Sequence, residues 1–117
     1  MKLSDFEIAR SAFERARGLM LRRKIKKPIL FVFPRSSRLG SAIHSFFVFT
    51  PFDAVFLDER KRIIDVRSDV KPFIPLIVPR AAAKYLIEGP AGWAKKRRLK
   101  LGGEDRIRRA IDSLLTF

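Results

Sequence analysis

Short apolar runs separated by polar, proline-containing or glycine-containing stretches dominate the chain, and this pattern is typical of β-strands. The strands predicted from it are residues 29–33, 43–49, 54–57, 62–67 and 85–88. Residues 29–33 are apolar at every position, which indicates a strand buried on both faces. Because few helical segments lie between the runs, we expect antiparallel rather than parallel pairing.

Proline and polar residues define the predicted connections between these strands. We expect Pro34 to end the first strand and residues 35–41 to form a loop. Residues 58–61 are expected to join two strands as a hairpin. Three prolines interrupt residues 70–80, and a proline cannot donate a hydrogen bond to a strand ladder. Residues 70–80 are therefore expected to be an edge strand or a loop lying over the sheet.

A helix is predicted at the N-terminus, where Ser4 and Glu7 have the spacing of a capping box. Apolar residues then recur at spacings of three and four, and Gly18 suits the helix end. The apolar face of this predicted helix consists of Phe6, Ala9, Phe13, Ala16 and Met20. We expect this face to cover a sheet, with no catalytic role.

A second helix is predicted at the C-terminus, with Glu104 and Asp105 at its start, where negative charge suits the helix dipole. Its apolar stripe consists of Ile107, Ala110, Ile111, Leu114 and Leu115. Such a stripe is too apolar to remain in water. We expect it to pack on the sheet of its own chain; the alternative is a weak homodimer formed through this helix.

The predicted fold class is α+β. We expect a mostly antiparallel, barrel-like sheet of five to seven short strands, with an N-terminal and a C-terminal helix. The 117 residues suit a single domain spanning 1–117, with a helical tail over residues 105–117.

Composition narrows the chemistry. Cysteine is absent and His44 is the only histidine, which excludes disulfides and thiol catalysis and leaves no basis for a zinc site, so we expect no metal or cofactor. Asparagine and glutamine are also absent, a pattern expected of hyperthermophile proteins. No apolar run approaches the roughly 20 residues of a membrane-spanning helix. We therefore expect a cytoplasmic protein without a membrane partner.

Positive charge is concentrated in two stretches of a chain whose net charge is +14. Nine bases and no acid lie between Glu14 and Asp53, and five bases and no acid lie between Glu88 and Glu104. These stretches have no acids of their own to pair with, so we expect a nucleic acid or another polyanion as partner. The predicted polyanion-binding residues are Arg22, Arg23, Lys24, Lys26, Lys27, Lys95, Lys96, Arg97, Arg98 and Lys100. A solvated, thermophile-type surface is the competing explanation.

The residues themselves give little support for catalysis. Ser45 and His44 are neighbours in a predicted strand, so their side chains point to opposite faces and cannot form a dyad. Asp53 is expected to hold the adjacent turn at Thr50 by local hydrogen bonds. Asp65 is expected on a solvated face. We therefore predict no enzymatic activity that depends on His44.

Several blocks resemble the domain of unknown function 192 family, an uncharacterised group found in bacteria and archaea. The blocks that carry the resemblance are Arg17–Met20 with Arg22, Leu30–Phe33, Ile43–Phe47, Pro51–Asp58, Lys71–Pro72 and Tyr85–Gly92. The resemblance implies a compact α+β domain with a curled, mostly antiparallel sheet, and it implies no established activity.

The same resemblance implies a candidate site at the positions that match the motif. These positions are Arg17, Gly18, Met20, Arg22, His44, Pro51, Asp53 and Glu88, and the family attaches no role to them. Two functions follow as hypotheses. The first is a non-enzymatic binding module for an anionic partner. The second is an enzyme or small-ligand-binding domain with a pocket around His44, Asp53 and Glu88.

Overall fold

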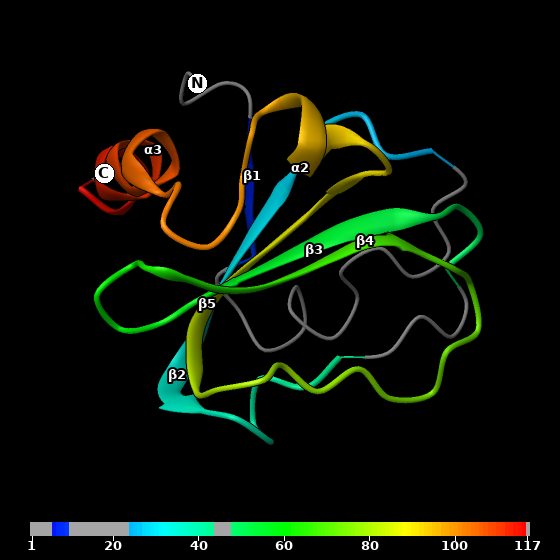
Figure 1. Cartoon of the computed structure of the whole chain (residues 1–117), viewed down its shortest axis with the longest axis horizontal. Helices are drawn as coiled ribbons and strands as arrows, with labels where there is room; N and C mark the ends of the chain where they lie inside the picture. Colours follow the sequence, from blue (N-terminus) through cyan, green and yellow to red (C-terminus); the bar gives the residue numbers. More distant parts are fainter. Residues whose placement is uncertain (1–5, 10–23, 44–47, 117) are drawn as a thin grey trace.

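A computed structural model describes residues 6–9, 24–43 and 48–116 of the chain (Figure 1). Five strands form one sheet in the order β1-β2-β5-β3-β4. The elements are β1 (Glu7–Ala9), β2 (Ile29–Ser37), β3 (Phe52–Leu57), β4 (Ile63–Val70), β5 (Ala83–Pro90), α2 (Trp93–Lys96) and α3 (Asp105–Leu115). The fold is therefore α+β with a mixed five-stranded sheet and two described helices, as far as those residues extend.

The sheet is open, so the predicted barrel-like closure is wrong. β1 pairs in parallel with β2, and the other three pairings are antiparallel. β1 and β4 are the two edges, and no described residue pairs one with the other. β1 is only three residues long, and β4 has exposed polar residues toward its end, including Ser68 and Asp69. Neither edge is suited to closing a barrel.

Residues 7–9 form β1, which contradicts the predicted N-terminal helix at these positions. The backbone N–H of Glu7 donates to the carbonyl of Pro28 at 2.9 Å, and residues 7–9 pair with residues 29–31 of β2. Strand pairing with β2 outweighs the local capping signal here. The remainder of the predicted helix, Ser4 and Phe13–Met20 included, lies outside the described residues.

β2 also continues through Pro34, where the sequence predicted an end. Its register against β5 shifts between Val32 and Ser37, and this irregularity accommodates a residue without an N–H. Residues 71–82 form the predicted loop, apart from an isolated bridge in which Ile77 exchanges backbone hydrogen bonds with Ile43. Of the strand predicted over 43–49, residues 44–47 lie outside the described part.

Apolar side chains bury both faces of the sheet. On one face, Val55 and Ile87 pack against Trp93 of α2 and against Ile107 and Ile111 of α3. The other face is covered by connecting segments, which contribute side chains such as Ile25, Val48 and Ile77. All six residues of β3 are consequently buried. The predicted packing of the C-terminal helix within its own chain is confirmed, and Figure 1 shows both helices on the same side of the sheet.

Candidate anion-binding surface

The single-turn helix α2 is fixed to the sheet by its first residue. Trp93 is buried, and its ring meets the ring of Phe6 edge-on at a centroid distance of 6.3 Å. The same ring lies against Gly89 of β5, where an added Cβ would come within 2.8 Å of it. Only glycine at position 89 allows this approach. Aromatic packing on both sides therefore holds the start of α2 in place.

A carboxylate distant in sequence also fixes α2. Asp53 is fully buried, and its Oδ2 accepts a hydrogen bond from the Ala94 N–H at 2.9 Å. Its Oδ1 accepts from the Asp69 N–H at 2.8 Å, at the end of β4. No side chain caps α2 from its own N-terminal residue, Gly92, so Asp53 satisfies an N–H of the first turn that local sequence leaves open. The prediction that Asp53 holds the turn at Thr50 is therefore wrong.

Arginine occupies the position at the end of α2 where helices usually have glycine. The N–H of Arg98 donates to the carbonyl of Lys95, and the N–H of Leu99 donates to that of Ala94. These two bonds are typical of a helix that ends in a left-handed residue, which is usually glycine. Arg98 has a φ of 58° and is exposed. Left-handed backbone costs about 1 kcal/mol for a residue with a Cβ.

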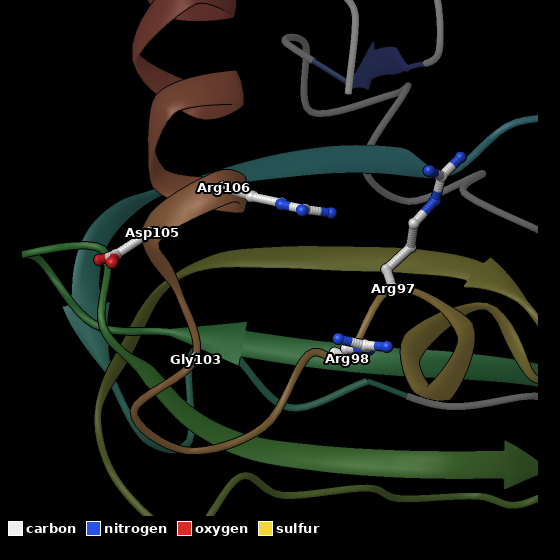
Figure 2. Close-up of a pocket in the computed structure, with 5 residues that line it drawn as sticks. All are labelled: Arg97, Arg98, Gly103, Asp105 and Arg106. Atoms are coloured by element: carbon white, nitrogen blue, oxygen red, sulfur yellow. The ribbon is translucent and has the colours of Figure 1, made fainter.

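Three arginines border a shallow hollow of about 220 Å³ between the end of α2 and the start of α3. Arg97, Arg98 and Arg106 line it together with Gly103 and Asp105. Figure 2 shows Arg106 extending from the first turn of α3 toward the side on which Arg97 and Arg98 stand, whereas the Asp105 side chain points away. The hollow therefore combines three guanidinium groups with one carboxylate, that of Asp105, so positive charge predominates in it.

These arginines belong to a larger basic surface, which we call the basic turn. It consists of Lys95, Lys96, Arg97, Arg98, Lys100 and Arg106, all of them exposed. None of these side chains is in an ion pair or side-chain hydrogen bond with any described residue. The charges of the basic turn thus remain available to an external anion.

The strand register brings part of the other basic stretch to the same end of the sheet. Ile29 of β2 pairs with Glu88 of β5, so the residues that precede β2 lie level with those that follow β5 and lead into α2. Lys24, Lys26 and Lys27 are exposed in this segment, which Figure 1 draws at the same end of the sheet as α2. The other two predicted residues, Arg22 and Arg23, lie outside the described part.

The candidate pocket is only partly described. Arg17, Met20, Arg22 and His44 lie outside the described residues, as does Gly18. Asp53 and Glu88 are both buried on neighbouring strands, but Asp53 lies opposite Gly89 whereas Glu88 lies opposite Ala54. Successive residues of a strand point to opposite faces, so the two carboxylates are on different sides of the sheet.

Asp65 was expected on a solvated face, and this prediction is wrong. Its side chain is 1% exposed and accepts hydrogen bonds from Nε of Arg67 and from the N–H of Arg80 at 3.0 Å. Burial by itself would raise the pKa of Asp65, but these hydrogen bonds and the charges of the two arginines outweigh it and lower the pKa. Arg67 also donates to the carbonyl of Val78 at 2.9 Å, so the pair ties the 71–82 loop to β4.

Sequence reasoning missed Arg106 as a member of the basic turn. It follows Glu104 and Asp105, so it lies outside the acid-free stretch. The helix start separates it from its acidic neighbours: the Asp105 side chain extends in another direction from that of Arg106, and Glu104 lies 3.5 Å from Arg108. Helical geometry over residues 104–108 was the signal that could have identified it.

Among the residues described, no group of three or more acidic or histidine side chains has an arrangement that could hold a metal ion. Within the same residues, neither helix has the length and apolar character needed to cross a bilayer.

Comparison with known proteins identifies the family. The model of the DUF192 family, described as "Uncharacterized ACR", matches residues 2–107. The chain belongs to the DUF192 family. A UPF0127 protein of Pyrococcus abyssi is 38% identical over 96 residues, which cover 82% of this chain and 80% of that protein. A UPF0127 protein of Pyrococcus horikoshii is 36% identical over 104 residues, covering 89% and 86%. These archaeal thermophile relatives confirm the resemblance.

Two solved structures share the fold of this DUF192 chain. A protein of unknown function from Novosphingobium aromaticivorans superposes with a TM-score of 0.74 at 19% identity, covering 82% of this chain and 69% of that one. A protein of Sinorhizobium meliloti, described as a candidate transcription regulator, gives 0.75 at 24% identity and covers 83% and 76%. At these identities the likeness shows the fold alone.

Proposed function

We propose that this DUF192 protein is a non-enzymatic module that binds the phosphate backbone of nucleic acid through the basic turn. The observation that carries the proposal is a cluster of six exposed cations that have no ionic partner among the described residues, on an anchored turn at the end of the sheet where Lys24, Lys26 and Lys27 precede β2. Such a role belongs in the cytoplasm, where nucleic acid is available.

Anchoring matters because binding costs less when the charged groups need little ordering. Trp93 and Asp53 fix α2 to the sheet, and the hollow holds Arg97 and Arg106 on adjoining elements. Arginine presents a planar donor fork that matches phosphate oxygens. Phosphates that engage these groups release counterions, which favours binding independently of base sequence.

A heat-adapted surface is the competing explanation for the charge, and the opposite end of the sheet shows what such a surface looks like. There Lys61 lies 2.7 Å from Asp112, and Arg62 lies 2.8 Å from Asp58. Interspersed acids and bases in mutual contact are the pattern that stabilises proteins at high temperature. Within the part of the chain that the structure describes, the basic turn has no such contacts, so ion pairing with those residues does not account for its charge.

The test is fluorescence anisotropy with labelled nucleic acid at two salt concentrations. We expect binding in the range of about 10⁻⁴–10⁻⁶ M at physiological salt, tightening steeply as salt is lowered. In the Arg97→Ala/Arg106→Ala variant, affinity should fall and the log–log salt slope should flatten by about 1.5, as expected for two lost phosphate contacts.

The matched control is Arg35→Ala/Arg60→Ala. It removes the same charge from exposed arginines at the opposite end of the sheet. Its salt slope should equal that of the unaltered protein. Absence of binding even at low salt would contradict the proposal, and so would equal losses in the two variants, since these would indicate an effect of net charge alone.

A further inference from the structure

Two phenylalanine side chains are exposed to solvent. Phe73 is 57% exposed and Phe49 is 46% exposed. Their rings contact each other edge-on, with centroids 6.4 Å apart and planes at 71°. The two ring planes are thus nearly perpendicular, and about half of each residue is in contact with solvent. A pair of exposed aromatic rings is costly in water, and it needs an explanation that an isolated exposed leucine does not.

The pair lies at the end of the sheet where the chain enters α2, the helix that begins the basic turn. Phe49 precedes β3 and Phe73 follows β4, and the first residue of β3, Phe52, pairs with Val70 of β4. Phe52 also pairs with Pro90, the last residue of β5, after which the chain enters α2. The register therefore brings the aromatic pair and the start of α2, which leads into the basic turn, to one common end of three neighbouring strands; the rest of the basic turn lies over the face that the helices cover.

The backbone at Phe73 is in a conformation that glycine would adopt at lower cost. Its φ is 65°, which is uncommon for a bulky side chain. Lys61 and Asp69 share this conformation, but their side chains form ion pairs within the chain. The Phe73 ring contacts the ring of Phe49 and remains mostly in solvent. Strain of this kind in an exposed residue is associated with ligand contact.

We infer that Phe49 and Phe73 stack on the bases of single-stranded nucleic acid whose phosphates are bound by the basic turn. The inference rests on the proposed function and specifies its ligand. Aromatic rings interleaved with cations are the arrangement by which proteins bind single strands without strong sequence preference. In a duplex the base faces are already stacked on one another, so the rings would have no base faces to contact.

Charge complementarity selects this occupant over a second copy of the chain. A second copy would bring another basic turn to the same end of the sheet, and like charges across an interface are unfavourable. A single strand brings phosphates to the cations and open base faces to the rings, so it satisfies both features of this end of the molecule.

The experiment compares three ligands by anisotropy and competition: labelled oligothymidylate, a labelled duplex of equal length, and inorganic polyphosphate as competitor. The variant is Phe49→Ala/Phe73→Ala, and Phe73→Gly serves beside it because it removes the ring while also relieving the left-handed strain. Leu39→Ala is the control, since Leu39 is exposed and follows β2 at the other end of the sheet.

We expect the phenylalanine variants to bind oligothymidylate about tenfold more weakly, because each base that stacks on an aromatic ring adds to the affinity. The dissociation constant of polyphosphate, obtained from the competition, should be the same for these variants as for the unaltered protein, because polyphosphate has no bases. The Leu39→Ala variant should bind all three ligands as the unaltered protein does. The unaltered protein should prefer the single strand to the duplex.

Failure of this inference is distinguishable from failure of the proposed function. Equal binding of single strand and duplex, with phenylalanine variants that bind oligothymidylate normally, would overturn the stacking inference and leave polyanion binding intact. Absence of binding to every ligand would overturn both. A change of oligomeric state in the phenylalanine variants, measured by light scattering and without weaker oligonucleotide binding, would assign the aromatic pair to a homodimer instead.

Discussion

The β3–β4 hairpin and the basic turn use charge in opposite ways. In the hairpin, Asp53, Asp58 and Asp65 each accept hydrogen bonds from backbone N–H groups, and the last two also contact arginine side chains. In the basic turn, six cations stand exposed with no such partner among the described residues. The two regions belong to one chain and adjoin the same sheet, so they share the same solvent and the same temperature.

The difference separates charge that serves the fold from charge that remains available to a partner. A buried carboxylate such as Asp53 or Asp65 costs free energy unless it is fully hydrogen-bonded, and both are. Exposed cations cost little, and they gain little from the chain itself. Substitutions in the hairpin should therefore change the free energy of unfolding, whereas substitutions in the basic turn should change binding.

The largest effect is expected from Asp53→Ala. It would leave the N–H groups of Asp69 and Ala94 without their acceptor in a buried place. We expect a loss of about 3 kcal/mol in the free energy of unfolding, measured by urea denaturation. A loss below about 0.5 kcal/mol, typical of surface positions, would contradict the role of Asp53 in holding α2.

A smaller loss, with a defined pH dependence, is expected from Asp65→Asn. Because the folded pKa of Asp65 is lowered from 3.8, the ionised form stabilises the fold above that ordinary value. This contribution is lost as pH falls through the lowered value, so the unaltered protein should lose stability there.

In Asp65→Asn we expect a loss of about 2 kcal/mol at neutral pH and a smaller further loss on acidification. Thermal unfolding monitored by circular dichroism at neutral pH and at pH about 3 measures both quantities. Parallel acid dependence in the two proteins would show that Asp65 does not contribute in this way.

The smallest change in stability, of opposite sign, is expected from Arg98→Gly. Glycine adopts the left-handed φ of 58° without strain, so we expect a gain of about 0.5 kcal/mol after the entropy cost of glycine. The same variant loses one guanidinium from the hollow and should bind nucleic acid several-fold more weakly.

The Arg98→Gly variant is tested by two measurements. Its melting temperature should rise, and its affinity for nucleic acid should fall. The control is Gly102→Ala, which adds a Cβ at a φ of 83° in the same connection and removes no charge. It should lower the melting temperature and keep the affinity. A variant Arg98→Gly that binds as well as the unaltered protein would remove Arg98 from the binding surface.

Local patterns predicted those elements whose signals agree with their packing. Residues 54–57 are apolar throughout and lie in the fully buried β3, and the 3.6-residue period of the C-terminal segment matches the buried side of α3. The capping box at Ser4 and Glu7 failed at residues 7–9 because pairing with β2 is non-local. The strand end predicted at Pro34 was wrong because a shift in the register of β2 accommodates the proline.

The candidate site divides in the same way. Exposure of Lys95–Arg98 followed from charge in the sequence, because a run of cations without acids is rarely buried. The backbone hydrogen bonds of Asp53 and Asp65 could not be predicted, since their donors lie 15 to 41 residues away. The exposure and left-handed conformation of Phe73 likewise depend on the loop path, which local sequence does not determine.

The most direct test of the account is the location of the nucleic-acid footprint on the folded protein. The isotopically labelled chain is titrated with a short oligothymidylate, and the chemical shifts of its backbone amides are followed. This measurement reports on all these surfaces at once. We predict that the largest shifts fall on residues 95–98, 103–106 and 24–27 and, through base stacking, on Phe49 and Phe73, with small shifts near Arg35 and Arg60. Shifts concentrated around Arg35 and Arg60, or spread evenly over the exposed cations, would contradict the assignment of the basic turn as the binding surface.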